Sequence, residues 1–250
     1  MNATTEFSGR SAFVTGAGTG IGAATAAELA ARGAKVAMMG RRAGMLEEAA
    51  AAIRAAGGDV LILIGDVAKA KDVADAVGKT VAAFGGLHMA VNNAGVDGGT
   101  QKLADLSVES WNDTIGINLS GVFFGLKYQI PAIIASGGGA IVNVSSVFSD
   151  RGLPRHAAYT ASKHGVHGLT RTAAHDYACD KVRINELLPG VIDTPMLDSN
   201  RGMVDQMTAF IPQRRLGQPA EVARAICFLL GESASYMTGA RVAVDGGFLI

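Results

Sequence analysis

Short runs of strand-forming residues alternate with alanine-rich segments along this 250-residue chain, and this alternation constrains the fold more than any other feature. The short runs show little apolar/polar alternation, as is typical of parallel strands covered by helices on both faces. The segments between them are rich in alanine, leucine and glutamate, which favour helix. Strands are expected at Ser11–Thr15, Lys35–Met39, Val60–Ile64, Leu87–Asn92, Ala140–Ser145, Val182–Leu188 and Arg241–Asp245. Helices are expected at Gly22–Arg32, Gly44–Ala56, Lys71–Phe84, Val108–Ser136, Tyr159–Tyr177 and Glu221–Leu230.

Repeated strand–helix–strand units predict right-handed crossovers onto one sheet. The expected fold class is therefore α/β, a doubly wound, seven-stranded parallel sheet of Rossmann type with helices on both faces. Residues 1–250 are expected to form a single dinucleotide-binding and catalytic domain. The one long irregular stretch runs from Pro189 to Pro219. A connection of that length inside a domain predicts a substrate loop at about 190–219.

Charge and composition exclude several classes of protein. Lys plus Arg and Asp plus Glu both number 22, so the net charge is zero, which argues against binding to nucleic acid or to an acidic membrane surface. No stretch approaches the ~20 apolar residues that cross a bilayer. The first residues lack a signal-peptide pattern, and two cysteines cannot form a disulfide framework or a zinc site. We expect a soluble cytoplasmic protein with no metal.

A glycine-rich turn follows the first expected strand, in the run Thr15-Gly16-Ala17-Gly18-Thr19-Gly20-Ile21-Gly22. Glycines there let the main chain turn sharply and approach a pyrophosphate, and the N-terminus of the next helix offers free N–H groups. Such a turn between a first strand and a first helix predicts a dinucleotide site. A plain tight turn is the alternative interpretation.

A phenol and an amine lie four residues apart at Tyr159 and Lys163, at the start of an expected helix, and therefore share one helix face. A free tyrosine is a poor base at neutral pH, and a nearby ammonium lowers the pKa of the phenol toward the operating range. Ser146 stands thirteen residues before Tyr159, at the end of an expected strand. Ligands of open α/β sheets bind at that edge. Ser145 is its competitor for the same role.

These features together resemble the short-chain dehydrogenase/reductase family in its single-domain form of about 250 residues. The glycine spacing differs from GxGxxG and fits the family's TGxxxGxG arrangement, and Asn92-Asn93-Ala94-Gly95 is similar to its NNAG motif. The resemblance implies a cofactor site made of Gly16, Gly18, Thr19, Gly20, Ile21, Gly22, Arg41, Arg42, Asp66, Val67, Asn93, Ala94, Gly95, Tyr159, Lys163, Pro189, Gly190, Ile192 and Thr194.

The resemblance also implies catalytic roles. It favours Ser146 over Ser145 as the hydroxyl that orients the substrate oxygen, with Tyr159 exchanging the proton. Lys163 would bind the nicotinamide ribose and tune the phenol, and Asn118 would hold a water that connects Lys163 to solvent. The implied reaction is hydride transfer between nicotinamide and a secondary alcohol or ketone, with no metal.

The end of the second strand distinguishes the two cofactors. An acid there binds the adenosine ribose, whereas Gly40 stands at that position here and Arg41 and Arg42 follow it. Guanidinium groups bind phosphate well, so we expect NADP rather than NAD.

The substrate is expected to be a small, largely apolar alcohol or ketone. Apolar residues of the 190–219 segment either wall its pocket or form the buried stripe of a short helix, and we favour the stripe; these residues are Met196, Leu197, Met203, Met207, Phe210 and Ile211. Glu186 lies in an expected central strand, where a buried carboxylate needs a partner such as an arginine. His156, His164 and His167 are interpreted as surface or interface residues.

By analogy with the family we expect a homotetramer or a dimer, formed by the helices of Asn118 and Tyr159. Two other functions stay open. One is a 3-oxoacyl thioester reductase, which would use Arg151, Arg155, Arg171, Arg214 and Arg215 to dock a carrier protein. The other is a non-catalytic dinucleotide sensor on the same fold.

Overall fold

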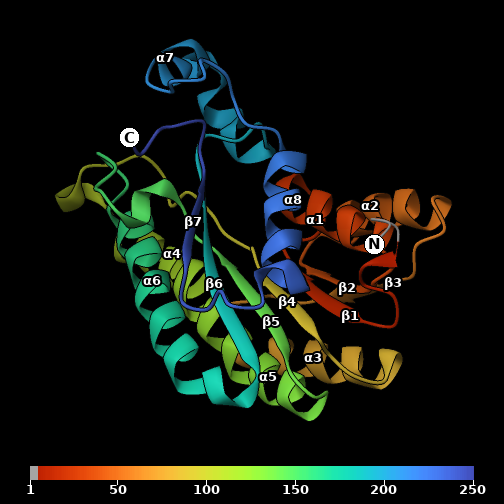
Figure 1. The fold of residues 1–250 in the computed structure, drawn as a ribbon. Coiled ribbons are helices and arrows are strands. Elements are labelled where there is room, and N and C mark those ends of the chain that lie inside the picture. The colour runs from red at the N-terminus through yellow and green to blue at the C-terminus, as the bar shows by residue number, and fades with distance from the viewer. Residues whose placement is uncertain (1–4) are drawn as a thin grey trace.

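Seven parallel strands form one sheet at the centre of the computed structural model, which describes residues 5–250 apart from the side chains of residues 199 and 200 (Figure 1). The strands are β1 (Ser11–Thr15), β2 (Lys35–Gly40), β3 (Val60–Ile64), β4 (Met89–Asn92), β5 (Gly139–Val144), β6 (Val182–Pro189) and β7 (Arg241–Val244). Their order across the sheet is β3-β2-β1-β4-β5-β6-β7. The predicted fold class is confirmed, and each predicted strand is found within two residues of its expected limits.

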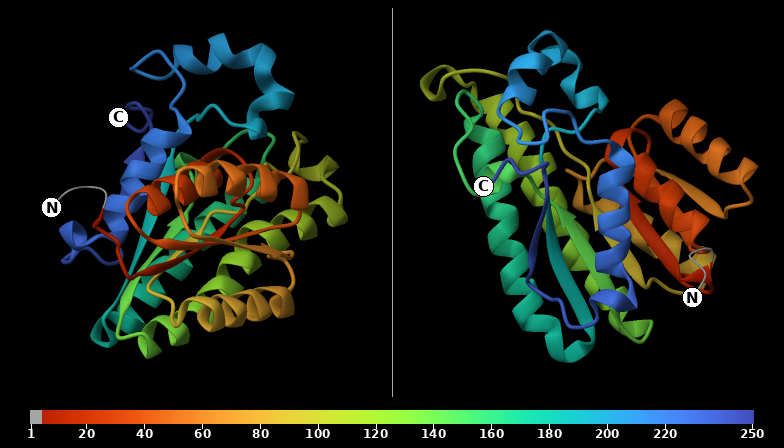
Figure 2. Two further views of the ribbon diagram at one scale, coloured as in Figure 1. Left: turned by 90° about the vertical axis from the view of Figure 1, so that its right-hand side faces the viewer. Right: turned by 45° about the horizontal axis from the view of Figure 1, so that its top comes forward.

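Helices cover both faces of the sheet, so the strands carry apolar side chains in both directions. On one face lie α1 (Gly20–Ala31), α2 (Ala43–Ala55) and α8 (Pro219–Leu230), whose apolar residues share a core with those of β1 and β2. On the other lie α3 (Ala70–Phe84), α5 (Gly121–Ala135) and α6 (Ala157–Tyr177). The short helix α4 (Val108–Ile115) precedes α5, and α7 (Val204–Ala209) stands apart from both layers (Figure 2).

The helix predicted over Val108–Ser136 is not one regular helix. A π-helical turn at Gly116–Ser120 separates α4 from α5. The turn begins at Gly116, and Gly121 follows it. A Cβ on Gly121 would come within 3.0 Å of the Val67 side chain, so this close approach needs glycine. By length and composition Val108–Ala135 also passes as a membrane span, which corrects the expectation that no such stretch exists. Its buried residues belong to the core between α5 and the sheet.

The segment after β6 is more regular than predicted. A 3₁₀ segment (Pro195–Met203) leads into α7, beyond the carboxyl ends of the strands (Figure 2). The buried apolar stripe favoured for this segment is wrong, because Met196, Met203 and Phe210 are 44%, 47% and 77% exposed. Within the described residues only Ile211 of that set is fully buried. This helical segment projects from the domain and meets too little of it to cover its apolar side chains.

Strand order fixes where the site can lie. In the sheet, β2 lies on one side of β1 and β4 lies on the other. The chain therefore leaves β1 toward one edge of the sheet and leaves β4 toward the opposite edge. The connections after these two strands diverge and leave a crevice at their carboxyl ends. The ends of β5 and β6 lie along the same edge. Most of the residues predicted for cofactor and catalysis follow these four strands, and the others follow β2 and β3.

Candidate active site

The glycine turn after β1 is built by close contacts between main-chain segments. Gly16 and Gly20 have φ of +65° and +56°, in the left-handed region that favours glycine. A Cβ on Gly22 would come within 2.2 Å of the Gly16 carbonyl oxygen and 2.6 Å of the Asn93 side chain. The loop after β4 is therefore held directly against the turn.

Thr15 and Asn93 lock this contact with hydrogen bonds. The Thr15 hydroxyl accepts from the main-chain N–H groups of Asn93 and Ala94 at 2.9 and 3.0 Å. The Asn93 amide donates to the Thr15 carbonyl oxygen at 3.0 Å. Asn93 is one of the residues predicted for the cofactor site, and its partner Thr15 is a buried hydroxyl to which the motif analysis gave no role.

The turn fits a dinucleotide pyrophosphate. Helix α1 begins at Gly20, and along the described chain no side chain hydrogen-bonds to its first N–H groups. These groups and the positive end of the helix dipole face the crevice beside β4. Glycine at positions 16 and 22 lets the turn pack closely on the loop after β4, because a Cβ at either position would clash with Asn93. The site therefore has the donors that a pyrophosphate needs.

Two arginines and an aspartate lie beside the glycine turn and the end of β3. Arg41 Nη1 lies 3.9 Å from Asp66 Oδ2, and Arg42 Nη2 donates to the Thr19 hydroxyl at 3.4 Å. Both arginines are exposed. Arg42 thus contacts the glycine turn through Thr19, and Arg41 lies beside Asp66. Val67, which the sequence also predicted for the cofactor site, is buried against Gly121.

The segment after β6 closes over the turn. Thr194 packs on the glycine turn, 3.1 Å from the position of a Cβ on Gly20. Gly190 lies against Asp245 and donates its N–H to the Val244 carbonyl oxygen, and Ile192 is buried. Of the residues predicted in this segment, Thr194 contacts the glycine turn, whereas Gly190 packs on the end of β7 and Ile192 joins the core.

The predicted catalytic hydroxyls lie at the junction of β5 and α6. The Ser146 hydroxyl accepts from the Phe148 N–H at 3.2 Å and lies near enough to the Tyr159 phenol to oppose the rise in its pKa. Ser145 instead donates its hydroxyl to the Lys163 carbonyl oxygen at 3.3 Å. Ser146, rather than its neighbour, meets the phenol, which is the arrangement the sequence favoured.

Burial dominates the electrostatics of this group. It raises the pKa of Tyr159 above its usual value, with the Ser146 hydrogen bond opposing the shift and Asp97 adding to it. Burial also lowers the pKa of Lys163 to about 8, against the favourable charge of Glu186. The expected lowering of the phenol's pKa is therefore wrong for the protein by itself, because burial disfavours the charged phenolate and raises the pKa.

Lys163 is held below the phenol. Its Nζ donates to the Val144 carbonyl oxygen at 3.0 Å and lies 5.7 Å from the centre of the Tyr159 ring. Only 4% of Lys163 is exposed. Spacing of four residues on α6 accounts for the shared direction of the two side chains.

Asn118 lies in the π-helical turn and clamps the loop after β4. Its Oδ1 accepts from the Val96 N–H and its Nδ2 donates to the Val96 carbonyl oxygen, both at 2.8 Å. Nδ2 also donates to the Ser162 hydroxyl at 3.2 Å. The nearby main chain at Gly95 approaches both Asn118 and Lys163, so Asn118 stands beside the predicted relay.

Several residues of the site were missed by sequence reasoning or interpreted wrongly. Asp97 acts on the phenol through space, although no motif includes it. His167 is not simply a surface residue, because its Nδ1 lies 2.7 Å from Glu186. Glu186 has the predicted arginine partner, Arg241, at 3.3 Å. A carboxylate within an expected central strand was the sequence signal for Glu186.

Comparisons with known proteins agree with this geometry. Residues 16–249 match a family model described as enoyl-(acyl carrier protein) reductase. Cyclohexanol dehydrogenase of Acinetobacter sp. (strain SE19) is 40% identical over 243 residues, covering 97% of this chain and 96% of that protein. A 2,5-dichloro-2,5-cyclohexadiene-1,4-diol dehydrogenase of Sphingobium indicum is 42% identical over 248 residues, covering 97% and 98%. The crystal structure of levodione reductase has a TM-score of 0.93 at 35% identity, covering 96% of this chain and 98% of that one.

Proposed function

We propose that Tyr159 is the acid–base group in the reaction of this chain, which belongs to the short-chain dehydrogenase/reductase family. The chain is an NAD(P)-dependent oxidoreductase that interconverts secondary alcohols and ketones. One observation carries the assignment of Tyr159: its phenol meets the Ser146 hydroxyl at the carboxyl end of β5, above the Lys163 ammonium.

Each side chain has a distinct task in this proposal. Ser146 donates a hydrogen bond to the substrate oxygen and fixes it beside the phenol. Tyr159 gives the proton during ketone reduction and takes it during alcohol oxidation. Since burial raises the pKa of Tyr159, its phenol is protonated at neutral pH and ready to donate. Alcohol oxidation, which needs the phenolate, is therefore expected to gain rate as the pH rises.

Lys163 and Asn118 support this exchange. The bound NAD(P) supplies or accepts the hydride. In this proposal Lys163, whose Nζ donates to the Val144 carbonyl oxygen, would hold the nicotinamide ribose and favour the phenolate. Asn118, whose amide clamps Val96, would hold a water on the path from Lys163 to solvent. The glycine turn, with Asn93 and Thr194, would hold the pyrophosphate and the nicotinamide end.

We further propose that NADP is preferred over NAD. Gly40 leaves the ribose position without an acid, and Arg41 and Arg42 lie within reach of the glycine turn. Cations there favour a 2′-phosphate. A higher kcat/KM with NADP than with NAD is the expected result, and a clear preference for NAD would overturn this part of the proposal.

The proposed substrate is a largely apolar secondary alcohol or ketone carried on a ring. Two of the relatives are named for activity on six-membered rings, cyclohexanol and a cyclohexadienediol. Phe148, two residues after Ser146, packs edge-on against Phe248 of the C-terminal tail at 5.7 Å between ring centres. This aromatic pair beside the Ser146 turn and the partly exposed apolar residues of the 190–219 segment would surround a ring.

The thioester reductase receives less support. Arg215 is engaged by Glu221 at 2.8 Å, and Arg151 stacks over the Phe248 ring at 5.3 Å. Docking an acidic carrier needs free guanidinium groups beside the active site, and these two are occupied.

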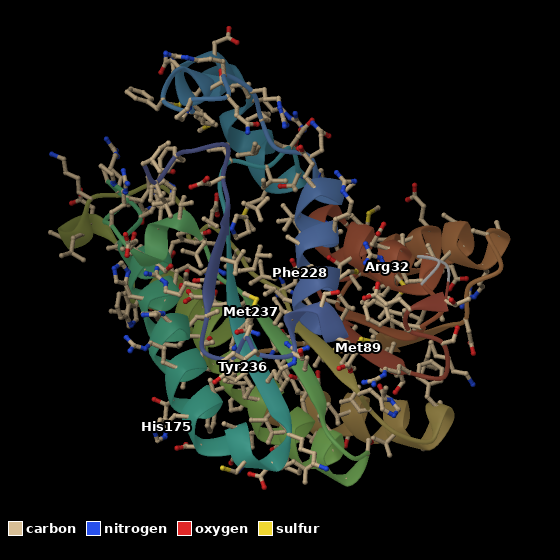
Figure 3. The ribbon with its side chains drawn as sticks, in the orientation of Figure 1. Arg32, Met89, His175, Phe228, Tyr236 and Met237 are labelled. Carbon is tan, nitrogen blue, oxygen red and sulfur yellow. The ribbon has the colours of Figure 1, made fainter. Side chains whose placement is uncertain are left out.

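We also propose a cytoplasmic homotetramer. Phe123 on α5 is 46% exposed, and Phe228 on α8 and Tyr236 before β7 are 43% and 103% exposed (Figure 3). These apolar side chains on two separate helix surfaces suit two kinds of subunit contact. Sedimentation equilibrium checks this, and a monomer at micromolar concentration would contradict it.

The central experiment is a screen of cyclic and open-chain secondary alcohols and ketones with each cofactor, run on wild type and on Tyr159→Phe. Absorbance of the reduced nicotinamide reports turnover. Tyr159→Phe should bind cofactor normally and lose turnover by about a hundredfold to ten-thousandfold, the usual range for removing an acid–base group. A sensor would keep its function in that variant, so retained activity would refute the assignment.

A further inference from the structure

Glu186 is a fully buried carboxylate in the middle of strand β6. Its Oε2 contacts two basic side chains. His167 Nδ1 on α6 lies 2.7 Å away and Arg241 Nε on β7 lies 3.3 Å away. Within residues 5–250, Oε1 is a buried oxygen with no hydrogen-bond partner. Burying a carboxylate in this way costs free energy of desolvation, so its position on β6 requires an explanation.

Arg241 carries the connection to the catalytic serine. Its Nη2 donates to the Ser149 hydroxyl and its Nη1 to Asp150 Oδ1, both at 2.9 Å. The Ser149 hydroxyl in turn donates to the Ser146 carbonyl oxygen at 2.7 Å. Arg241 thus holds the short turn that follows β5, and that turn sets the direction of the Ser146 hydroxyl.

His167 carries the connection to the catalytic helix. It stands one helical turn after Lys163 on α6, on the side that faces the sheet. Its bond to Glu186 therefore fixes α6 against β6 close to Lys163 and Tyr159. The same carboxylate thus contacts both elements that carry the reacting side chains.

Stability alone gives a poor account of this arrangement. A neutral network already joins the same sheet face to its helices: Asn92 and Gln129 exchange two amide hydrogen bonds at 2.8 and 3.0 Å, and Asn143 donates to the Thr170 hydroxyl. Buried ion pairs seldom stabilise a fold more than apolar residues of similar size, because desolvation offsets their attraction.

We propose that Glu186 is a positioning residue that holds the Ser146 turn and helix α6 in the relation the reaction needs. This inference rests on the roles proposed above for Ser146, Tyr159 and Lys163. The relative placement of the reacting side chains then depends on one carboxylate that touches no substrate.

The negative charge of Glu186 also acts on the catalytic group through Lys163. The groups that face Glu186 are His167 and Lys163 from α6 and Arg241 from β7, and Asp150 neutralises the outer side of Arg241. Glu186 is the charge that opposes the lowering of the Lys163 pKa. Removing it should let Lys163 lose its proton at lower pH, and the phenol, deprived of the ammonium, should then ionise at higher pH.

The test compares Glu186→Gln and Arg241→Gln with wild type and with Glu232→Gln, a control that removes an exposed ion pair to Arg10. Both test variants should lower kcat about tenfold while cofactor Kd stays within about twofold, because the reacting groups are displaced but the cofactor site is not. The pH midpoint of alcohol oxidation should rise in Glu186→Gln. Arg241→Lys should recover part of the kcat lost in Arg241→Gln.

Arg241 retains 28% of its side-chain exposure, so Arg241→Gln keeps the test decisive even if Glu186→Gln folds poorly. Unchanged kcat in Arg241→Gln, or in folded Glu186→Gln with an unmoved pH midpoint, would overturn the inference while leaving the proposed function intact. Retained turnover in Tyr159→Phe would overturn the proposed function and this inference with it.

Discussion

The glycine turn after β1 and the serine turn after β5 occupy the same edge of the sheet, and they are built differently. The first presents main-chain N–H groups and is shaped by the absence of side chains, as at Gly22. The second presents buried side chains whose pKa values are shifted by desolvation, as at Tyr159 and Lys163. A main-chain site recognises a group common to all dinucleotides, whereas a side-chain site can tune a proton. Substitutions in the first should change cofactor affinity, and substitutions in the second should change turnover.

The largest effect expected outside Tyr159 itself is for Ser146→Ala. The variant removes the hydrogen bond to the substrate oxygen and to the phenol, and turnover should fall about a hundredfold to a thousandfold, as for other donors to a reacting oxygen. Cofactor Kd, measured by fluorescence titration, should not change. Ser145→Ala is the matched control, and an equal loss of turnover there would contradict the distinction between the two serines.

Lys163→Met should separate turnover from stability. Turnover should fall about a hundredfold, because the phenolate loses its ammonium. Lys163 has a folded-state pKa of about 8 against an ordinary value of 10.5, so its charge destabilises the fold below pH 8, and stability is regained as the pH rises from 8 toward 10.5.

Removing that charge should therefore leave unfolding free energy at pH 7 unchanged or raise it, by at most about 3 kcal/mol at 1.36 kcal/mol per pKa unit. Chemical denaturation at pH 7 and pH 9.5 measures this. A variant less stable than wild type at pH 7 by several kcal/mol would contradict the stated cause of the pKa shift.

Gly22→Ala should act on the other half of the site. Its Cβ would overlap the Gly16 carbonyl oxygen, so the turn must open, weakening cofactor binding about tenfold and the fold by about 1–3 kcal/mol. Gly78→Ala in α3 is the control, because nothing lies within 4 Å of its Cβ and alanine favours helix. Isothermal titration and thermal unfolding distinguish the two. Equal effects would show that the close approach at Gly22 is unimportant.

The smallest effect is expected for Gly40→Asp, a substitution in the cofactor part of the site that should change the preference for NADP over NAD. A Cβ at Gly40 meets only ordinary contacts with Leu46, at 3.6 Å or more, so the side chain fits. The carboxylate should repel a 2′-phosphate and lower the ratio of kcat/KM for NADP over NAD by about tenfold, or about 1.4 kcal/mol. Gly40→Ala adds the same Cβ without charge and should leave the ratio within about twofold. A matching change in both variants would exclude the electrostatic cause.

The sequence determined the sheet, its helices and the residues that meet at its carboxyl edge, because these follow from local patterns. Each of these patterns can be recognised within one segment of the sequence: the apolar runs, the glycines after a first strand, and the phenol four residues before an amine. Strand order then brings those segments together, since parallel strands place their carboxyl ends at one edge.

Tertiary structure decided what depends on distant or displaced groups. Glu186 and Arg241 lie in different strands, and only the pairing of β6 with β7 brings them together. The sign of the Tyr159 pKa shift depended on how deeply the phenol is buried, which helical spacing does not encode. The exposed apolar residues of the 190–219 segment likewise depended on its projection from the domain. Burial and long-range pairing are properties of the whole packing, so no local pattern of residues could have fixed them.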